Sequence, residues 1–429
     1  MKNYNMIVIG AGPAGMAAAL EAKNNGLDKI LIIERDKYIG GILPQCIHNG
    51  FGLEYFGDEL TGPEYAYKFI QKLENSNIEV MKETMVLNVT NDKTITAVNK
   101  DKGVLKLKAK TIILAMGCRE RTRENIIIPG DRPSGILSAG TAQRYTNIEG
   151  YIPGKEIIIL GSGDIGLIMA RRMKLEGANV KAVLEIMPYS SGLVRNKVQC
   201  LDDFDIPLKL SHTVTRIEGK NRLKRVEIAQ VDENLNVIDS TRRWESCDTL
   251  LLSVGLIPEN ELSKSIGLNL HPVTGGVYVN ENRETNINGV FAAGNVLHVH
   301  DLVDWVSEEA EIAGKSAVDY INSNLEKRKV KVDLLPGENV TYTVPQSIEY
   351  KLKDKKFIKV FMRVKKPMEN VNISFLYDNK NLVSFKKKIV MPGEMVTANL
   401  PKSLINEKMN KIKVSITKKG GWKIWQKMI

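Results

Sequence analysis

Two glycine-rich segments of the same form recur in this 429-residue chain, and each follows a short apolar run. The first is Gly10–Gly15 and the second is Gly161–Gly166, and a stretch of helix-forming residues follows each of them. An acidic residue, Glu34 or Glu185, ends the next apolar run, 24 residues after the first glycine in both cases. Strand, glycine turn, helix and strand in this order predict two βαβ units, each in a parallel sheet of its own.

The three glycines of the first segment suit a backbone that binds a pyrophosphate. Gly10 makes the tight turn, Gly12 lets phosphates approach the backbone, and Gly15 lets the helix pack closely on the strand. The start of the helix favours phosphate, and the Glu34 carboxylate can accept hydrogen bonds from a ribose. A glycine turn used only for packing is the alternative, but strand, helix and acid together favour nucleotide binding. At the second segment, Glu185 would repel a 2′-phosphate, so NAD(H) is favoured over NADP(H).

Six segments between residues 6 and 320 follow a pattern known from flavoproteins. They are Gly10–Gly15 with Glu34, the doublet Gly40-Gly41, Ala115–Gly117, Gly161–Gly166, Val254–Pro258 and Val290–Asn295. On these segments the chain resembles the two-dinucleotide-binding-domain flavoproteins of the pyridine nucleotide–disulfide oxidoreductase superfamily. The resemblance implies an α/β fold with FAD at the first glycine segment, NAD(P)H at the second, and hydride transfer between the two cofactors.

The resemblance also implies which residues contact each cofactor. Those implied for FAD are Gly10, Gly12, Pro13, Ala14, Gly15, Glu34, Arg35, Gly41, Ile42, Ala115, Met116, Gly117, Gly294, Asn295, Asp301, Leu302 and Val303. Those implied for NAD are Gly161, Gly163, Asp164, Ile165, Gly166, Glu185 and Gly255. Asn295 stands where the family usually has Asp. Its amide keeps an acceptor for a ribityl hydroxyl but removes a negative charge near the phosphates, so we expect FAD binding to survive.

The redox disulfide of the family is missing from this sequence. One class has a cysteine two residues after the Gly-Gly doublet and another five residues further on, and these positions are Leu43 and His48 here. The CxxC pair of thioredoxin reductases is missing as well. The four cysteines lie far apart, which leaves no cysteine ligand set for zinc or an iron–sulfur cluster and suits a reducing cytosol. We therefore expect no bound metal and no dithiol–disulfide chemistry.

Three side chains are candidates for a direct part in the chemistry. The resemblance places the segment after the Gly-Gly doublet against the isoalloxazine ring, where Cys46 could be a thiolate or sulfenate centre and His48 a proton donor. The alternatives are a packed small residue for Cys46, which the general burial of free cysteine favours, and a structural histidine for His48. His300 comes just before a helix expected over 302–322. The resemblance implies that the N-terminus of that helix points at the flavin, where its N–H groups would stabilise the reduced form, and an acid–base step through His300 and Asp301 is the other interpretation.

The pattern changes after about residue 324, where apolar and polar residues alternate as in β-strands. Segments 336–347 and 392–403 are identical at seven of twelve positions, and each comes before an Ile-Lys-Val strand. This repeat predicts a small all-β sandwich built from two similar halves. The predicted domains are an FAD-binding domain over 1–122 and 285–326, an NAD(H)-binding domain inserted at 123–284, and the sandwich over 330–429.

The basic charge of the chain is confined to the last hundred residues. Residues 331–429 contain 21 Lys and Arg against 8 Asp and Glu, whereas the net charge of the whole chain is +11. A solvated lysine-rich surface is the simplest interpretation, and docking to an acidic partner or an anionic membrane face is the functional one. No recognised nucleic-acid-binding motif accompanies the charge, so nucleic acid is not expected as a partner.

The sequence also bears on where the protein works. It enters a strand pattern within its first residues, which leaves no room for a signal peptide, and no run approaches about 20 apolar residues. We therefore expect a cytoplasmic protein without a transmembrane segment.

Three segments narrow the resemblance: Gln45–Gly52, Gly163–Ala170 and Gly294–Val303. They look like FAD/NAD oxidoreductases associated with anaerobic glycerol-3-phosphate dehydrogenase, which work with a second flavoprotein. The resemblance implies an NADH:acceptor oxidoreductase subunit that exchanges electrons with a partner dehydrogenase linked to glycerol-3-phosphate oxidation, and by analogy a homodimer. Two alternatives stay open: a stand-alone flavin dehydrogenase of a small amine or hydroxy compound, and a flavin-bearing scaffold subunit whose basic sandwich recruits acidic partners.

Overall fold

The computed structural model describes residues 1–323, 327–350 and 356–418. The ends of two predicted domains, at 324–326 and 419–429, and the segment 351–355 lie outside the described residues. No helix in the described part of the chain combines the length and the apolar character needed to cross a membrane.

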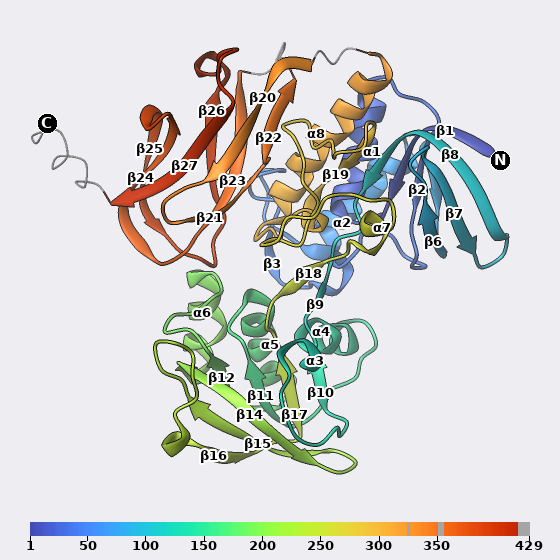
Figure 1. Ribbon diagram of the computed structural model, residues 1–429. Helices are drawn as coiled ribbons and strands as arrows, with labels where there is room; N and C mark the ends of the chain where they lie inside the picture. Colours follow the sequence, from blue (N-terminus) through green and yellow to red (C-terminus); the bar gives the residue numbers. More distant parts are fainter. Residues whose placement is uncertain (324–326, 351–355, 419–429) are drawn as a thin grey trace, which may run out of the picture. The chain divides into compact units, whose positions relative to one another are not determined.

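The chain forms two compact units, one of Met1–Cys118 with Pro258–Ile429 and one of Arg119–Ile257 (Figure 1). The second unit is therefore inserted in the first, but it ends at Ile257 and not at residue 284. The reason is packing: Leu268 and Val277 are buried in the same core as the strands of the first unit. The chain passes between the units at β9 (Cys118–Glu120) and β18 (Leu256–Pro258).

The first unit is built on a largely parallel sheet. Its strands are β1 (Lys2–Ile9), β2 (Ile30–Ile33), β5 (Glu79–Met81), β6 (Thr84–Val89), β7 (Thr94–Asn99), β8 (Gly103–Leu114) and β19 (Val290–Ala292). The order is β5-β2-β1-β8-β7-β6, and β19 pairs in parallel with the C-terminal end of β8. The carboxyl ends of β1, β8 and β19 therefore lie side by side at one edge.

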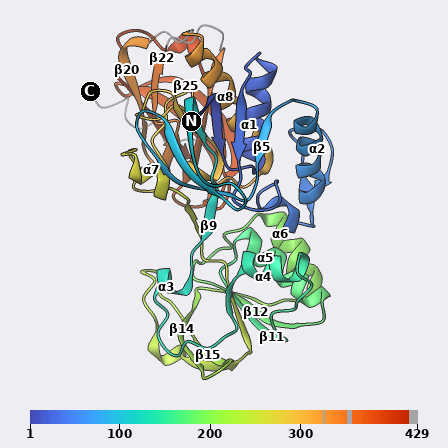
Figure 2. The same ribbon diagram turned by 90° about the vertical axis from the view of Figure 1, so that its right-hand side faces the viewer.

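Helices cover this sheet, and two of them pack directly on each other. The helices of the first unit are α1 (Pro13–Asn24), α2 (Gly62–Glu74), α7 (Glu261–Ser265) and α8 (Val303–Ile321). Helices α1 and α8 lie side by side (Figure 2), because small residues let their backbones approach. A Cβ atom on Gly314 would lie only 2.3 Å from the Ala18 carbonyl oxygen.

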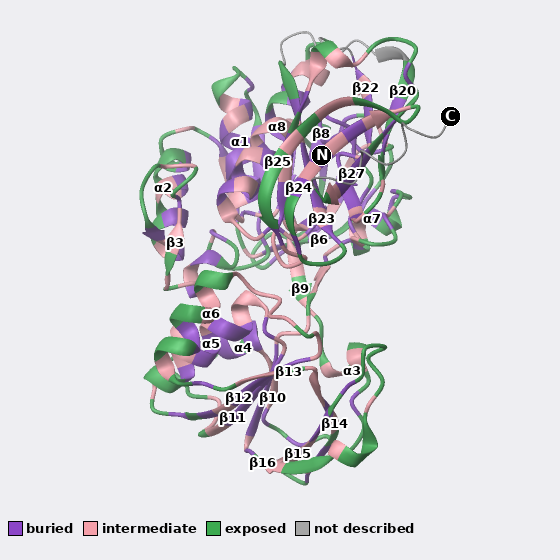
Figure 3. Ribbon diagram, turned by 90° about the vertical axis from the view of Figure 1, so that its left-hand side faces the viewer, coloured by how far each residue is buried: buried purple, intermediate pink, exposed green. Residues whose placement is uncertain are grey.

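The second unit contains the second predicted βαβ unit. Its parallel strands are β10 (Ile136–Ser138), β11 (Glu156–Leu160), β12 (Asn179–Glu185), β13 (Leu208–Leu210) and β17 (Thr249–Leu252), in the order β10-β17-β11-β12-β13. Its helices are α3 (Arg123–Ile126), α4 (Ala139–Asn147), α5 (Asp164–Leu175) and α6 (Val194–Cys200). An antiparallel sheet is formed by β14 (His212–Gly219), β15 (Leu223–Gln230) and β16 (Arg243–Ser246). The near-continuous burial of β11 and β17 (Figure 3) is typical of parallel strands covered on both faces.

The C-terminal region is a sandwich of two sheets, as its alternating pattern predicts. Its strands are β20 (Lys327–Pro336), β21 (Val340–Val344), β22 (Ser347–Tyr350), β23 (Phe357–Val364), β24 (Met368–Tyr377), β25 (Lys380–Val390), β26 (Val396–Pro401) and β27 (Lys411–Lys418). One sheet has the order β22-β20-β27-β24-β25 and the other β21-β23-β26, with a shared apolar core. Strands β21 and β26 come from the two copies of the repeat, and they flank β23.

The sandwich belongs to the first unit. Tyr342, Phe361 and Met395 are buried in the same core as Ile7 and Leu114 of the parallel sheet. Backbone and side-chain bonds continue this contact, since Val279 and Gln346 are joined by two hydrogen bonds. The sandwich is therefore packed on the first sheet as part of one unit.

Candidate cofactor-binding site

Three segments predicted to bind FAD meet at the carboxyl ends of neighbouring parallel strands. Gly10 follows β1, Ala115 follows β8 and Gly294 comes shortly after β19. A Cβ atom on Gly10, whose φ is +105°, would lie 2.3 Å from the Ala115 carbonyl oxygen. A Cβ atom on Gly294 would lie 2.9 Å from Ala14 Cβ. Glycine makes these approaches possible, and the shared edge is where open α/β sheets bind their ligands.

The N-terminus of α1 is open to a ligand. The helix begins after Gly12 with Pro13 in its first turn, and no side chain of the described residues caps it. A Cβ atom on Gly12 would lie 3.8 Å from the Gly41 Cα, an ordinary contact distance, whereas one on Gly15 would lie 1.8 Å from the Gly10 carbonyl oxygen. Gly15 is therefore required by the packing of the protein itself. Gly12 leaves space beside free N–H groups, which fits the diphosphate of FAD.

The N-terminal turn of α8 lies beside that of α1. The Cβ position on Gly294 that is close to Ala14 is also 3.1 Å from Val306 Cγ1, in the first turn of α8. Helix α8 begins after Leu302, again without a side-chain cap from the described residues. Two helix N-termini therefore lie at the same edge, where their dipoles favour negative charge.

Glu34 and Glu185 hold their glycine loops in the same way. Glu34 is buried, and its carboxylate accepts hydrogen bonds from the Ala11 N–H at 2.8 Å and from the N–H two residues after itself. Glu185 is also buried and accepts from the Ser162 N–H at 3.0 Å and the Met187 N–H at 3.0 Å. The sequence predicts that these acids contact a ribose, but it does not predict that they hold the glycine loop. The equal spacing of 24 residues between the first glycine and the acid is the sequence signal for this second role.

The predicted NAD residues also gather at one edge, in the second unit. A Cβ atom on Gly161 would lie 2.1 Å from the Ser253 carbonyl oxygen, and Gly163 is the residue before α5, where the Gly166 N–H donates to Ser253 Oγ at 3.1 Å. Asp164 Oδ1 accepts from the Leu193 N–H at 2.8 Å, so its carboxylate holds the loop that follows β12. Gly255 follows β17 with a φ of +101°. Gly166 and Ile165 lie in the first turn of α5.

The other predicted FAD residues differ in exposure. Gly41, Arg35 and Ile42 are exposed, whereas Met116 and Gly117 are half-buried after β8. Asn295 uses its side chain on protein groups: Oδ1 accepts the His300 N–H at 3.0 Å and Nδ2 lies 3.6 Å from Cys118 Sγ. The amide of Asn295 therefore orders the loop that leads to α8.

Cys46 and His48 lie in the segment after the Gly-Gly doublet, next to the hairpin of β3 (Asn49–Phe51) and β4 (Leu60–Thr61). Cys46 Sγ lies 3.4 Å from the Ile42 carbonyl oxygen, and burial raises the pKa of the Cys46 thiol to about 12. His48 Nδ1 lies 3.0 Å from the Asn49 carbonyl oxygen. A thiol with so high a pKa is protonated at neutral pH, which supports a packing role for Cys46.

A buried carboxylate anchors this segment to α8. Asp304, in the first turn of α8, accepts hydrogen bonds from the Gly52 N–H and the Glu54 N–H, both at 2.9 Å. Asp304 is only 3% exposed. The loop that carries Cys46 and His48 is therefore tied to the helix N-terminus that lies beside α1. The role of Asp304 could not be predicted from the sequence, because only the fold brings Asp304 and Gly52, which are 252 positions apart, together.

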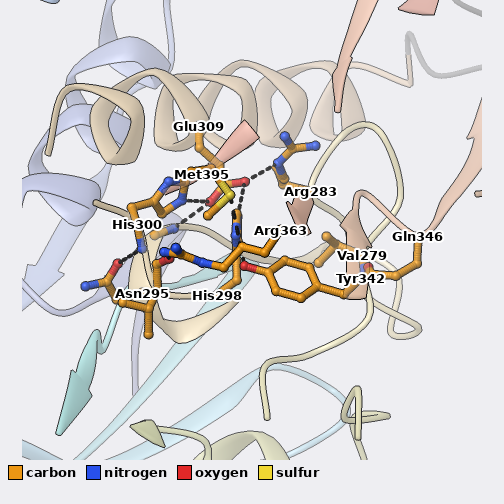
Figure 4. Close-up of polar contacts among 12 residues, drawn as sticks. Val279, Arg283, Asn295, His298, His300, Glu309, Tyr342, Gln346, Arg363 and Met395 are labelled. Carbon is orange, nitrogen blue, oxygen red and sulfur yellow. Dashed lines mark hydrogen bonds and ion pairs between the residues drawn. The ribbon is translucent and has the colours of Figure 1, made fainter. Parts of the chain in front are cut away.

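His300 lies in a buried cluster of charged and polar side chains (Figure 4). Its Nε2 is 3.0 Å from Glu309 Oε2, and the Nε2 of His298 is 3.4 Å from Glu309 Oε1. Arg283 approaches from the other side, with Nε 2.9 Å from Glu309 Oε1. Glu309 also accepts the Gly294 N–H at 3.1 Å, so the cluster is joined to the cofactor edge. Glu309, which bonds to all of these groups, is therefore placed to order the loop that carries His298 and His300.

The positive and negative charges buried in this cluster balance each other. Burial lowers the pKa of His298 to about 4, so its ring is neutral at pH 7. Burial alone would raise the pKa of Glu309, but Arg283 and the two imidazoles hold it well below its usual value. His298, His300 and Glu309 could each offer one ligand atom to a metal ion, all within 4.8 Å. The Arg283 guanidinium already neutralises the carboxylate, so a cation there would add uncompensated buried charge.

Asp301 is bound by the sandwich. Its carboxylate forms an ion pair with Arg363 of β23 and accepts a hydrogen bond from the Met395 N–H. Arg363 also donates to the Val299 carbonyl oxygen at 3.1 Å. Sequence analysis predicted Asp301 from the family pattern, but nothing in the sequence indicated Arg363.

Comparisons with known proteins agree with this arrangement. The sequence model of the family described as "Pyridine nucleotide-disulphide oxidoreductase" matches residues 4–317. The chain is 24% identical over 287 residues to hydrogen cyanide synthase subunit HcnB of Pseudomonas protegens, covering 62% of this chain and 59% of the relative. It is 23% identical over 340 residues to an opine oxidase subunit of Agrobacterium tumefaciens, covering 73% and 64%. It is 26% identical over 313 residues to an NADH oxidase of Methanocaldococcus jannaschii, covering 69% and 64%. The chain thus spans less than two thirds of the length of these relatives.

Solved structures show the same fold. Thioredoxin reductase of T. acidophilum aligns with a TM-score of 0.60 and 22% identity, over 76% of this chain and all of that protein. An NAD-dependent persulfide reductase of A. fulgidus aligns with a TM-score of 0.58 and 19% identity, over 87% of this chain and 67% of that protein.

Proposed function

This chain belongs to the pyridine nucleotide–disulphide oxidoreductase family, and on that basis we propose that it is an FAD-dependent NADH:acceptor oxidoreductase. The observation that carries the proposal is the pair of glycine-rich loops, Gly10–Gly15 and Gly161–Gly166. Each has a glycine before its helix, which leaves no side chain at the N-cap position, and a buried glutamate that accepts a hydrogen bond from a loop N–H. When bound, FAD and NAD(H) supply the hydride-transfer chemistry, as members of the family bind both cofactors.

The residues of the chain bind and orient. The N-termini of α1 and α8 favour negative charge at the edge of the first sheet, and Gly12 leaves the space for it. Asp304 holds the Cys46 segment against the same edge. The raised pKa of Cys46 supports a role for this segment in lining the flavin site, and it argues against disulfide exchange.

The second glycine-rich loop, Gly161–Gly166, favours binding of NADH over NADPH. Glu185 ends β12 and is buried, and its carboxylate accepts hydrogen bonds from Ser162 and Met187. A 2′-phosphate bound beside it would meet a negative charge held in place by four protein donors. Glu185→Gln removes that charge with little change in shape. The variant should therefore show a smaller difference between NADH and NADPH in the reduction of the flavin.

The acceptor is a partner protein in this proposal. Two relatives are named as subunits, of hydrogen cyanide synthase and of opine oxidase. The resemblance of Gln45–Gly52 and Gly294–Val303 to oxidoreductases associated with glycerol-3-phosphate dehydrogenase suggests a partner that oxidises glycerol-3-phosphate. If the isolated chain itself turned over a small amine or hydroxy compound, the stand-alone dehydrogenase would replace this proposal.

An anaerobic titration of the purified full chain tests the central claim. NADH and then NADPH are added while the visible flavin absorption is followed, and wild type is compared with Glu185→Gln. We expect rapid bleaching by NADH and slower or weaker bleaching by NADPH. A protein that binds no FAD contradicts the proposal outright. A protein that binds FAD but is reduced by neither nucleotide would favour the scaffold alternative.

A further inference from the structure

A sandwich residue holds the loop that leads into α8. The Arg363 guanidinium forms an ion pair with Asp301 and donates to the carbonyl oxygens of Val299 and Pro392, both at 3.1 Å. Figure 4 labels Arg363 and Met395. The other Asp301 oxygen accepts the Met395 N–H. The two charged side chains are 17% and 8% exposed. This contact joins β23 and the segment before β26 to the loop that precedes α8.

The loop bound in this way reaches the cofactor edge from both of its ends. At its start, the His300 N–H donates to Asn295, which follows Gly294. At its end, α8 begins at Val303, and Val306 lies against the Gly294 backbone. A displacement of Asp301 would therefore move the N-terminal turn of α8 relative to α1.

We propose that Arg363 is a positioning residue for the flavin site: through Asp301 and Val299 it sets the N-terminal turn of α8 against that of α1. The inference rests on the proposed FAD function. It makes the sandwich part of the flavin site, in contrast to the scaffold alternative in which the sandwich only recruits partners. The chemistry suits arginine, because a planar guanidinium can bond a carboxylate and a carbonyl oxygen at fixed angles.

Loss of Arg363 would act in two ways. The Asp301 carboxylate would stay largely buried without its cation, next to a helix N-terminus that is then the nearest source of positive potential. The Val299 carbonyl oxygen would lose its donor, which frees the backbone of the loop. Both changes act on the loop and leave the strands of the first sheet unchanged.

Lys359 provides a matched control. It lies on the same strand β23 and forms an ion pair with Glu308, further along α8. Its side chain is similarly half-buried, at 24% exposure. Lys359→Met therefore removes the contacts of this ammonium group with Glu308 and with the Trp305 ring, 5.9 Å away in the first turn of α8, while the bonds of Arg363 to the loop at 298–302 stay. A general weakening of the interface would appear in both variants, whereas a positioning effect would appear only at Arg363.

The experiment measures FAD binding to the full-length apoprotein by quenching of flavin fluorescence, and the midpoint potential of the bound flavin. Arg363→Met should weaken FAD binding about tenfold or more and shift the potential, because a buried charge loses its partner. Lys359→Met should stay within about twofold of wild type. Arg363→Lys keeps the positive charge but loses the planar guanidinium, so its FAD affinity should lie between those of the two methionine variants. It takes the place of Arg363→Met in the test if that variant does not fold.

A second comparison isolates the pathway through Asp301. Asp301→Asn in the Arg363→Met background should add less than the effect of Asp301→Asn alone, because both changes remove the same contact. Equal Kd and potential for Arg363→Met, Lys359→Met and wild type would overturn the inference while leaving FAD binding intact. A wild-type chain that binds no FAD would instead overturn the proposed function.

Discussion

Arg283 and Glu309 form an ion pair in the interior of the first unit, with Nε 2.9 Å from Oε1 and side chains that are 1% and 0% exposed. The Glu309 carboxylate also accepts the Gly294 N–H, so one buried charge connects the segment before β19, the cofactor edge and α8. A pair of this kind adds little net stability when intact, but it is costly to break.

Glu309→Gln should therefore destabilise the first unit severely. The substitution leaves the Arg283 guanidinium buried without its counter-charge, at a cost of about 3–5 kcal/mol. Calorimetry should show a lower melting temperature for the transition of the first unit, with that of the second unit unchanged. The neighbouring Glu308→Gln is the matched control, since its side chain is 37% exposed and its loss should cost about 1 kcal/mol or less. Equal effects for both variants would contradict the buried pair.

Acid should weaken the first unit within a definite pH range. The pKa of His298 falls to about 4 in the fold, while an unfolded histidine has its ordinary value of 6.5. Between these values the unfolded chain binds more protons, so stability is complete above about pH 6.5 and falls by up to about 1.4 kcal/mol per pH unit toward pH 4. Glu309, whose pKa is lowered, adds a loss in the same direction below its unfolded value of 4.5.

Denaturant titrations from pH 7.5 to pH 4.5 measure this slope. His298→Gln should flatten it, because the group that titrates is removed. His212→Gln, in the second unit, should leave the slope unchanged. A slope that persists in His298→Gln would assign the pH dependence to other groups.

Gly12→Ala should separate cofactor binding from folding. A Cβ atom there meets Gly41 Cα at an ordinary 3.8 Å, so the stability of the apoprotein should change by about 1 kcal/mol or less. The same methyl group occupies the space above the α1 N-terminus, so FAD binding should weaken about tenfold or more. Gly26→Ala, beyond the far end of α1, is strained by the φ of +84° at that position, so it should lower the stability of the apoprotein yet leave FAD binding unchanged. A Gly12→Ala protein with wild-type affinity would place the diphosphate elsewhere.

Cys46→Ala should keep most of the activity. The pKa of this thiol is raised to about 12 by burial, so little thiolate is present at pH 8. NADH-dependent reduction of an artificial acceptor should stay within about twofold of wild type, and iodoacetamide should label Cys46 slowly. Cys247→Ala, in the second unit, is the control for a cysteine without a site role. A large loss of rate confined to Cys46→Ala would restore its catalytic interpretation.

Local sequence patterns are enough to predict the two glycine turns and the sandwich, because these features depend on residues that are close together in the chain. A tight turn at Gly10 or Gly161 needs glycine whatever surrounds it, and alternating strands predict a half-buried sheet. The two parallel sheets confirm the predicted fold class, whereas the strand orders around β1 and β11 and the place of β23 between the two repeat copies were not predicted.

Which charged residues contact each other depends on the folded arrangement of distant segments. Arg363 reaches Asp301 across 62 positions and Arg283 reaches Glu309 across 26, and neither pair leaves a periodic trace in the sequence. The end of the inserted unit at Ile257 was decided in the same way, because Leu268 and Val277 pack in the first core. Local patterns specify turns and strands, whereas pairing of distant side chains depends on how the packed elements bring them together.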